Sequence, residues 1–451
     1  MVRGRDAIWQ RIGGPWDMII VGGGITGAGL LREAAHLGVR ALLVERRDFA
    51  WGASSRSSKL VHGGLRYLKQ GDLRLTYESV RARNRLLRVG AGLITPLGFL
   101  LPVFRGEYPG RRMYGAALAV YDALGMQWSH HYNDAPDFSL LAPSLAPSRL
   151  RGGFSYRDAQ TDDARLVLRL VREAETAGGW TINYVAADSL LRDEHGQVRG
   201  VRLRDTESNR VAEVYATVVV NATGAWADHL RGQAGGPMRL RPLRGSHLIF
   251  PAWRFPVAQA IGFNHPADHR PVFALPWEGV TLVGTTDVDH TRPLDEEPAI
   301  SPEEVAYLMA ALTARFPSLA LSPSDAIAAY AGLRPVIGSD EADPSHESRD
   351  AALWDDGGLL TITGGKLTTY HESAIMALNA IRARIPGILP PASQAAPLDP
   401  LLPLPVGAAN LSPEQRQRLA GRYGADVSAL IAAAHPGELA AIPDTPVLWA
   451  E

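Results

Sequence analysis

The residues of this chain that could do chemistry gather in short glycine- and serine-rich segments. One of them, Gly22-Gly-Gly24-Ile25-Thr26-Gly27, lies between an apolar run at 18–21 and a helix expected over 26–37. In such a unit the first glycine permits a tight turn, the second lets the backbone approach a pyrophosphate, and the third lets the helix pack against the strand. A second apolar run, 41–44, ends at Glu45, whose carboxylate can accept hydrogen bonds from a ribose. The spacing therefore predicts a dinucleotide site; a purely structural glycine turn is the alternative.

Lysine is rare in this chain and marks two further segments. Only three of the 46 basic residues are lysines, and two of these lie in glycine/serine motifs, 57–64 around Lys59 and 364–369 around Lys366. An ammonium is a compact point charge that a guanidinium does not replace at a tight site. Lys59 and Lys366 are therefore candidate site residues, and ordinary surface lysines are the alternative.

Composition narrows the class of protein. A chain of 451 residues is too long for one compact core, so two or three domains are expected. The net charge of −1 gives no general attraction to nucleic acid, and the absence of cysteine excludes disulfides, iron–sulfur clusters, cysteine-ligated zinc and a cysteinyl–flavin bond. No metal site is expected. The first residues lack the apolar stretch typical of a secretory signal. The sequence contains no run of about 18 apolar residues, so no membrane-spanning helix is expected.

The elements that must position these segments alternate between strand and helix patterns. Strands are expected at 181–185, 198–204 and 211–220, the last running into Asn221-Ala-Thr-Gly224, and at 359–363 before Gly364-Gly365. A hairpin is expected over 272–283. Helices are expected over 74–89, 108–127, 161–178, 301–315 and 370–384. A proline-rich linker at 386–405 precedes two short helices at 412–421 and 425–434.

Several motifs occur in one order and together resemble the FAD-dependent sn-glycerol-3-phosphate dehydrogenases. They are the glycine unit, the stretch 54–67, Asp162–Leu166, Asn221–Gly224, Arg244–His247, Gly284–Asp287, Gly332–Pro335 and Gly364–Thr369. The stretch 54–67 and Gly364–Thr369 are specific to that family, whereas the glycine unit and Asn221–Gly224 are shared by many flavoproteins. Arg244 departs from the pattern, since the family often has lysine there. The resemblance also implies a helical C-terminal domain, of which only the beginning is expected in this chain.

The resemblance implies an α/β fold in which a Rossmann-like FAD-binding domain, of the glutathione-reductase/D-amino-acid-oxidase type, is interleaved with an antiparallel-sheet substrate domain. The expected FAD-binding parts are 15–92, 151–232 and 327–388. The expected substrate parts are 93–150 and 233–326, with an extension at 1–14 and a linker with an abbreviated helical region at 389–451.

The resemblance also implies oxidation of sn-glycerol 3-phosphate to dihydroxyacetone phosphate by hydride transfer to a non-covalent FAD. Arginine suits a phosphate clamp because its planar fork grips two oxygens. Expected substrate contacts are Arg66, Tyr67, Arg334 and Arg349; expected catalytic residues are His247, Arg334 and Lys366. His62 is a second candidate base, and an arginine that lowers the pKa of the substrate hydroxyl is a third option. Expected cofactor contacts are Gly22, Gly24, Ile25, Thr26, Gly27, Glu45, Ser54, Ser55, Ser58, Lys59, His62, Gly63, Asn221, Gly224, Gly365, Lys366 and Thr368.

Two other functions stay open on the sequence. One is another FAD oxidoreductase of this fold, acting on 2-hydroxy acids or amino acids; the other is an inactive flavin-binding protein. Family resemblance points to a membrane quinone as electron acceptor, and with no spanning segment expected, the contact with the membrane would be peripheral. The helix expected over 108–127, with Arg111 and Arg112 at its head and Leu118 and Leu124 along it, is the candidate for that contact. A cytoplasmic location at the inner face of the cell membrane follows, and dimerisation is left open.

Overall fold

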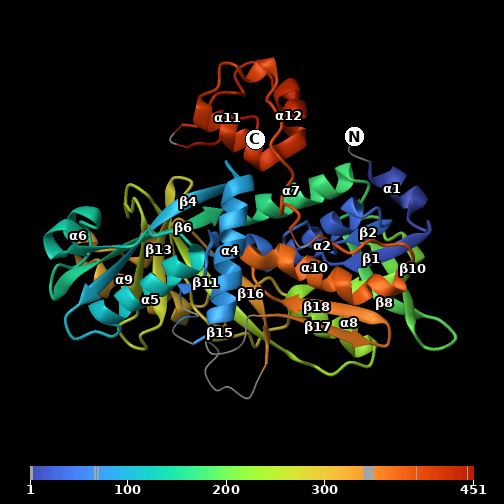
Figure 1. Ribbon diagram of the computed structural model, residues 1–451, viewed down its shortest axis with the longest axis horizontal. Helices are drawn as coiled ribbons and strands as arrows, with labels where there is room; N and C mark the ends of the chain where they lie inside the picture. Colours follow the sequence, from blue (N-terminus) through green and yellow to red (C-terminus); the bar gives the residue numbers. More distant parts are fainter. Residues whose placement is uncertain (1–3, 66–67, 69–70, 339–349, 393, 444) are drawn as a thin grey trace.

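The structure, a computed structural model, describes residues 4–65, 68, 71–338, 350–392, 394–443 and 445–451. Its strands form two sheets that lie side by side, with the long helix α4 (Leu73–Val89) standing between them in Figure 1. Asp72 caps this helix by accepting a hydrogen bond from the Leu75 backbone N–H. Within the described ranges, no helix is both long and apolar enough to cross a membrane.

The first sheet is largely parallel and has the strand order β17-β18-β10-β1-β2-β7, with β9 paired to β10 and β8 paired to β9. Its strands are β1 (Trp16–Val21), β2 (Ala41–Val44), β7 (Trp180–Ile182), β8 (Val185–Arg192), β9 (Val198–Asp205), β10 (Val211–Asn221), β17 (Ala351–Asp356) and β18 (Leu359–Gly364). Parallel strands covered on both faces have side chains buried on both sides, which explains the apolar runs 18–21 in β1 and 41–44 in β2.

Helices cover both faces of this sheet. They are α1 (Arg5–Arg11), α2 (Ile25–His36), α7 (Asp163–Thr176), α8 (Ala227–Gln233) and α10 (Tyr370–Ile381). Met18 and Ile20 of β1 pack with α2 and α10, whereas Ile19 and Val21 pack on the opposite face with Ile8 of α1 and Leu230 of α8.

The second sheet has the order β15-β11-β14-β13-β12-β4-β6-β3, with β16 paired to β11 and β5 to β6. Its strands are β3 (Leu60–Val61), β4 (Ile94–Phe104), β5 (His131–Asp134), β6 (Leu150–Thr161), β11 (Leu240–Pro251), β12 (Ala260–Asn264), β13 (Pro271–Trp277), β14 (Val280–Gly284), β15 (Val288–Asp289) and β16 (Ala328–Ile337). All its pairs are antiparallel except β4 with β12. Helix α9 (Pro302–Arg315) and the short α6 (Ala135–Leu141) pack in one apolar cluster, and α5 (Arg111–Gly125) packs in another with Phe99 and Tyr156.

The C-terminal region is a small helical unit with its own apolar core. It contains α11 (Pro413–Tyr423) and α12 (Val427–Ala433), packed through Leu411, Leu419 and Val427, and it lies beside α7 at the top of Figure 1. Single 3-10 turns occur at Ala53–Ser55, Gly224–Trp226, Pro317–Leu319, Pro323–Asp325, Leu367–Thr369, Arg382–Arg384, Val406–Ala408 and Gly424–Asp426.

The predicted fold class is confirmed, and most predicted elements match within a few residues. β6 and β16, which begin near the expected domain boundaries at 151 and 327, pair with strands of the second sheet. The expected helix at 108–127 is shorter, since α5 starts after Gly110 and ends at Met126 in a left-handed conformation. Its Leu118 is fully buried in the core, so that residue is not part of a membrane-facing surface.

Candidate functional site

A cavity of about 1080 Å³ is lined by residues of both sheets. From the first sheet and its loops come the glycine unit, Glu45, the turn after β10 and Gly365–Thr368. From the second come β4, β6, β12, β13 and β16, together with one side of α5. A ligand in this cavity would therefore touch both halves of the molecule at once, which suits a dinucleotide at one end and a substrate at the other.

The glycine unit leaves the start of α2 open to the cavity. A Cβ on Gly27 would lie 1.9 Å from the Gly22 carbonyl oxygen, so α2 packs against β1 as closely as predicted. Gly22 has φ +113°, and a Cβ there would lie 2.5 Å from the Ala222 carbonyl oxygen. The first turn of α2 contains no acidic residue, and its N-cap is Gly24. The first N–H groups of an α-helix have no partner within the helix, so an N-terminus without an acid of its own fits a pyrophosphate.

Glu45 closes this end of the cavity. Its carboxylate accepts hydrogen bonds from the backbone N–H groups of Gly23 (2.7 Å) and Arg47 (2.8 Å). Burial raises the pKa of Glu45, and these N–H groups oppose that rise. A carboxylate has about four lone-pair sites, so Glu45 keeps a lone pair for a ribose hydroxyl.

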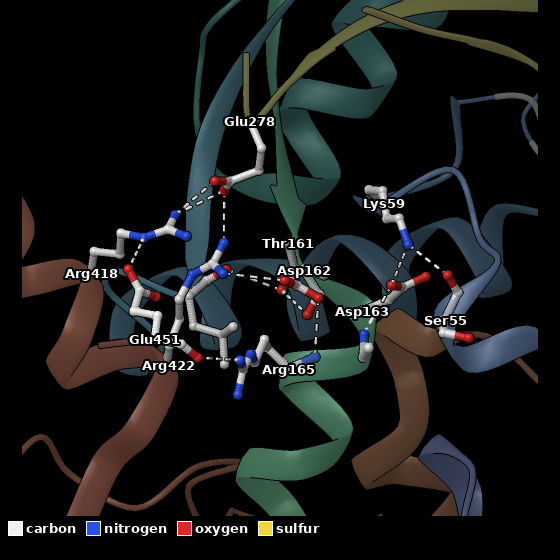
Figure 2. A network of polar contacts seen from close by, with 12 residues as sticks. Ser55, Lys59, Thr161, Asp162, Asp163, Arg165, Glu278, Arg418, Arg422 and Glu451 are labelled. Carbon is white, nitrogen blue, oxygen red and sulfur yellow. Dashed lines mark hydrogen bonds and ion pairs between the residues drawn. The ribbon is translucent and has the colours of Figure 1, made fainter. Parts of the chain in front are cut away.

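The serine-rich loop after β2, residues 52–58, is called the serine loop. It lines part of the cavity. Ser54 and Ser58 line the cavity, and Ser54 Oγ accepts the Ile25 N–H at 2.9 Å. Lys59 does not line it: its ammonium forms an ion pair with Asp163 of α7 (2.6 Å) and donates to the Ser55 carbonyl at 2.7 Å (Figure 2). Lys59 therefore acts as a brace between the serine loop and α7, and its expected contact with the cofactor stays a prediction.

The loop after β2 also places aromatic and basic side chains in the wall. The guanidinium groups of Arg47 and Arg56 stack on the Trp51 ring at 4.0 and 4.6 Å. Arg56 Nη1 is buried and has no hydrogen-bond partner among the residues that the structure describes. A buried guanidinium nitrogen without an acceptor, in the wall of the cavity, fits an anionic ligand such as a pyrophosphate.

The 364–369 motif joins the cavity where β18 ends. Gly365, Lys366 and Thr368 line it, together with His62 and Gly64 of the loop after β3. Gly365 has φ +69°, which favours glycine. Lys366 Nζ donates to Ser79 Oγ of α4 at 2.9 Å. Asp158 of β6 lies in the same wall and accepts from Arg83 Nη1 (3.0 Å), the Tyr121 hydroxyl (2.8 Å) and the Gly63 N–H (3.2 Å).

Arg334 of β16 is the basic side chain best placed for an anionic substrate group. Its Nη1 donates to Asp287 Oδ1 (2.6 Å) and to the Thr286 carbonyl (3.1 Å), and its Nη2 donates to Thr285 Oγ1 (2.8 Å). The Nε–H and one Nη2–H have no acceptor among the described residues. These two donors form the side edge of the guanidinium, which can bind two oxygens of one anion. Neighbouring Arg244, by contrast, pairs with Glu304 of α9 at 2.8 Å.

His247 of β11 lies behind the cavity wall. Its ring stacks on Tyr330 at 4.7 Å, and its Nε2 lies 2.8 Å from the hydroxyl of Ser58, which does line the cavity. Burial, together with the charges of Arg334 and Lys59, lowers the pKa of His247 to about 3. A neutral imidazole with this pKa is a weak proton acceptor, so the geometry favours a contact through Ser58 over direct base catalysis.

The predicted site residues thus fall into three groups. Those that line the cavity are Gly22, Gly24, Ile25, Thr26, Glu45, Ser54, Ser58, His62, Gly224, Arg334, Gly365, Lys366 and Thr368. Those placed behind the lining are Gly27, Ser55, Lys59, Gly63, Asn221 and His247. Asn221, for example, is fully buried and holds the turn after β10 by donating to the Ala227 carbonyl. Arg66, Tyr67 and Arg349 lie outside the described residues.

Sequence reasoning missed several parts of the lining, among them two that contain no recognisable motif. One lies beside Glu45 and consists of Val185–Asp188 of β8, Trp226 and the segment Leu294–Asp295. The other is apolar and aromatic, with Phe99, Met113, Tyr114, Phe263 and Phe273. Neither carries a sequence signal, because such residues also form ordinary cores. In the described parts of the chain, no group of three or more His, Asp or Glu residues could hold a metal ion.

Comparisons with known proteins agree with this site. The family model for FAD dependent oxidoreductases (DAO) matches residues 17–371. An aerobic glycerol-3-phosphate dehydrogenase of Bacillus subtilis is 39% identical over 376 residues, covering 82% of this chain and 67% of that protein. The corresponding protein of Staphylococcus aureus is 37% identical over the same shares.

Solved structures give the same result. The glycerol-3-phosphate dehydrogenase of Bacillus halodurans complexed with FAD is 30% identical and superposes with a TM-score of 0.75, covering 95% of this chain and 79% of that one. The L-α-glycerophosphate oxidase of Mycoplasma pneumoniae, with FAD bound, shares the fold at 17% identity, with a TM-score of 0.66 over 86% of this chain and 99% of that one. The chain therefore belongs to the FAD-dependent oxidoreductase family and, within it, to the aerobic glycerol-3-phosphate dehydrogenases.

Proposed function

We propose that this protein oxidises sn-glycerol 3-phosphate to dihydroxyacetone phosphate with a non-covalently bound FAD. The observation that carries the proposal is the open side edge of Arg334 in the same cavity as the dinucleotide end at Gly22–Gly27. The relatives' printed names and the FAD complex of the similar structure support it.

The reaction needs a phosphate held in place, a hydride removed from carbon 2 and a hydroxyl proton taken up. Bound FAD supplies the hydride acceptor at its N5 atom. Arg334 would clamp the phosphate with its side edge, with help from Arg66, Tyr67 and Arg349 in the expected substrate site. Lys366 would place a positive charge beside the flavin, where negative charge develops on reduction. The structure's lining puts His62 on the cavity side, which favours it over His247 as the proton acceptor.

Anaerobic reduction of the flavin tests this function against its alternatives. Adding glycerol 3-phosphate to the holoprotein should bleach the flavin absorbance, whereas a 2-hydroxy acid or an amino acid should not. Bleaching by those compounds instead would favour an oxidase of the same fold. Bleaching by dithionite alone would indicate an inactive flavin-binding protein.

We also propose that electrons pass to a membrane quinone at the inner face of the cell membrane. Helix α5 supports this proposal, because Met113 and Tyr114 line the apolar part of the cavity while Val120 and Met126 are exposed. Exposed Trp128 follows directly, and Arg111 and Arg112 suit anionic headgroups. The membrane contact is thus proposed for these outward-facing residues in place of Leu118 and Leu124. A homodimer would strengthen so small a contact.

Flotation with anionic vesicles tests the membrane proposal. Met126→Asp with Trp128→Asp should reduce vesicle binding and quinone reduction while leaving flavin bleaching by glycerol 3-phosphate intact. Trp253→Asp, which changes an equally exposed tryptophan elsewhere, is the matched control. Unchanged binding in the double variant would contradict this surface.

A further inference from the structure

Ser79 is a fully buried serine in the middle of α4 whose hydroxyl is used twice. It donates to the Leu75 carbonyl, one turn earlier in the helix, at 2.6 Å. It also accepts a hydrogen bond from Lys366 Nζ at 2.9 Å. Lys366 comes from the turn after β18, nearly three hundred residues later in the chain, so this contact joins α4 to the cavity wall that follows β18.

The chemistry of this contact fixes the direction of each partner. A serine hydroxyl has one proton and two lone pairs, and an ammonium only donates. Because the single proton of Ser79 is committed to the Leu75 carbonyl, only its lone pairs face Lys366. The hydroxyl therefore cannot turn its proton toward the ammonium, and one of the three ammonium N–H bonds is held toward α4.

The helix that carries Ser79 is itself held firmly. Arg83, one turn after Ser79, is buried and pairs with Asp158 at 3.0 Å, and the Tyr121 hydroxyl completes that cluster. Asp72 caps the start of the helix. The lone pairs of Ser79 therefore have a fixed position. Because a lysine side chain is flexible, such a fixed acceptor helps to define where the Lys366 ammonium lies.

We infer that Ser79 is a positioning residue that holds the Lys366 ammonium beside the flavin. This inference rests on the proposed function, in which Lys366 supports negative charge on the reduced flavin. Loss of the hydroxyl would leave the lysine charged but would remove this fixed acceptor, so the ammonium would be held less firmly and the reduced flavin would lose part of its electrostatic support.

The test measures the midpoint potential of the flavin in purified holoprotein, with thermal stability recorded alongside. Ser79→Ala should lower the potential in the same direction as Lys366→Met, by about a tenfold change in the reduction equilibrium, the size expected for one hydrogen bond to a charged group. Ser79→Thr keeps the hydroxyl, so its midpoint potential should match that of the parent protein. In the double variant, Ser79→Ala should add nothing to Lys366→Met.

Thr76 provides a matched control on the same helix. It is also fully buried, and its hydroxyl donates to the carbonyl one turn earlier, Asp72, at 2.8 Å, but it has no contact with Lys366 in the structure. Thr76→Ala should cost stability and leave the potential unchanged. If Ser79→Ala does not fold, Ser79→Cys, which keeps the volume with a weaker acceptor, takes its place.

Two results would overturn the inference, and they differ. A potential shifted by Lys366→Met but unchanged by the Ser79 variants would remove the role of Ser79 and leave the proposed function intact. A potential unchanged by Lys366→Met itself would remove the flavin role of Lys366, and the inference with it. Whether glycerol 3-phosphate bleaches the flavin of the parent protein is a separate measurement, and it decides the proposed function independently of these variants.

Discussion

At the scale of single residues, contacts with neighbouring residues order the Arg334 side chain before any ligand binds. Three contacts, to Asp287, Thr286 and Thr285, hold the guanidinium of Arg334, and the residue lines the cavity. Gly245 makes room for this arrangement, because a Cβ there would lie 2.3 Å from Arg334 Nη2. A side chain already ordered before binding loses less conformational entropy when the ligand arrives.

Replacing Arg334 tests the clamp. Arg334→Ala should raise KM and lower kcat for glycerol 3-phosphate, with a combined loss of about 2–4 kcal/mol in transition-state stabilisation. Arg334→Lys should recover only part, since an ammonium cannot grip two oxygens with a planar fork. Steady-state kinetics measure both. Arg241→Ala, which removes a partly exposed arginine paired with Asp289 outside the cavity lining, is the control and should change neither constant much. Parent-like kinetics in Arg334→Ala would remove the clamp.

At the scale of elements, the β1–α2–β2 unit was predictable because its signals are local. The structure begins and ends β2 at the predicted residues, and Glu45 follows it into the cavity wall. The positions of Lys59 and His247 were not predictable in the same way. Each depends on a partner far away in the chain: Asp163 on α7 for Lys59, and Tyr330 on β16 for His247. A motif gives residue types at a site, whereas long-range packing decides which of them face the ligand.

The close packing of α2 on β1 gives an element-scale prediction. In Gly27→Ala the new Cβ would meet the Gly22 carbonyl oxygen, and backbone on both sides prevents an easy shift. We expect loss of FAD binding and a large fall in thermal stability. Gly232→Ala is the matched control, because it also adds a methyl group to a helix but meets nothing within 4 Å. The control should be neutral or stabilising by about 0.5–1 kcal/mol. FAD retention after gel filtration, together with melting curves, decides the matter.

At the scale of the whole molecule, the linker after α10 is tied to the first sheet's helices. Asp399 accepts from Arg32 Nη2 of α2 at 2.6 Å, its backbone N–H donates to Glu173 of α7, and Leu398 is buried. The hydrogen bond with His36, aided by Arg32 and opposed by burial, lowers the pKa of Asp399 to about 2. The same bond raises the pKa of His36. The linker is therefore a packed part of the molecule whose attachment depends on pH.

The stability that Asp399 contributes should pass through a maximum in acid. A raised histidine pKa adds stability that is full below the ordinary value of 6.5 and lost as pH rises through the folded value. A lowered aspartate pKa adds stability that is present above 3.8 and lost as pH falls through about 2. The difference in melting temperature between parent and Asp399→Asn should therefore grow from about pH 8 to about pH 5.5 and shrink below about pH 4.

Asp17→Asn is the control for this pH profile. Asp17 also has a lowered pKa, but its partner is Arg40, which does not titrate in this range. Its difference from the parent should stay flat between about pH 8 and about pH 5.5. A flat profile for Asp399→Asn as well would show that His36 does not contribute.

The C-terminal unit is attached by charge as well as by shape. Glu278, in the turn between β13 and β14, accepts from Arg418 (2.9 Å) and Arg422 (2.7 Å) of α11, and Arg422 also reaches Asp162 at 3.2 Å (Figure 2). Close backbone contact adds to this, since a Cβ on Gly421 would lie 2.3 Å from the Ala91 carbonyl oxygen. Asp162 is followed directly by Asp163, the partner of Lys59. The first turn of α7 therefore contacts α11 on one side and the serine loop of the cavity on the other.

Glu278→Gln tests whether this attachment supports the cofactor site. The change keeps the size of the side chain but removes the charge that faces two guanidinium groups, so the free energy of unfolding should fall by about 1–3 kcal/mol. Proteolysis of the C-terminal unit should speed up. Because α11 and the serine loop both contact the first turn of α7, FAD should also dissociate faster, as followed by flavin fluorescence.

Glu78→Gln is the control. It removes an exposed carboxylate paired with Arg74 on α4, so it should change stability by less than about 1 kcal/mol and leave FAD release unaltered. If Glu278→Gln releases FAD no faster than Glu78→Gln does, the attachment of the C-terminal unit does not affect the FAD site. The ion pair between Lys59 and Asp163 then holds the serine loop without help from α11.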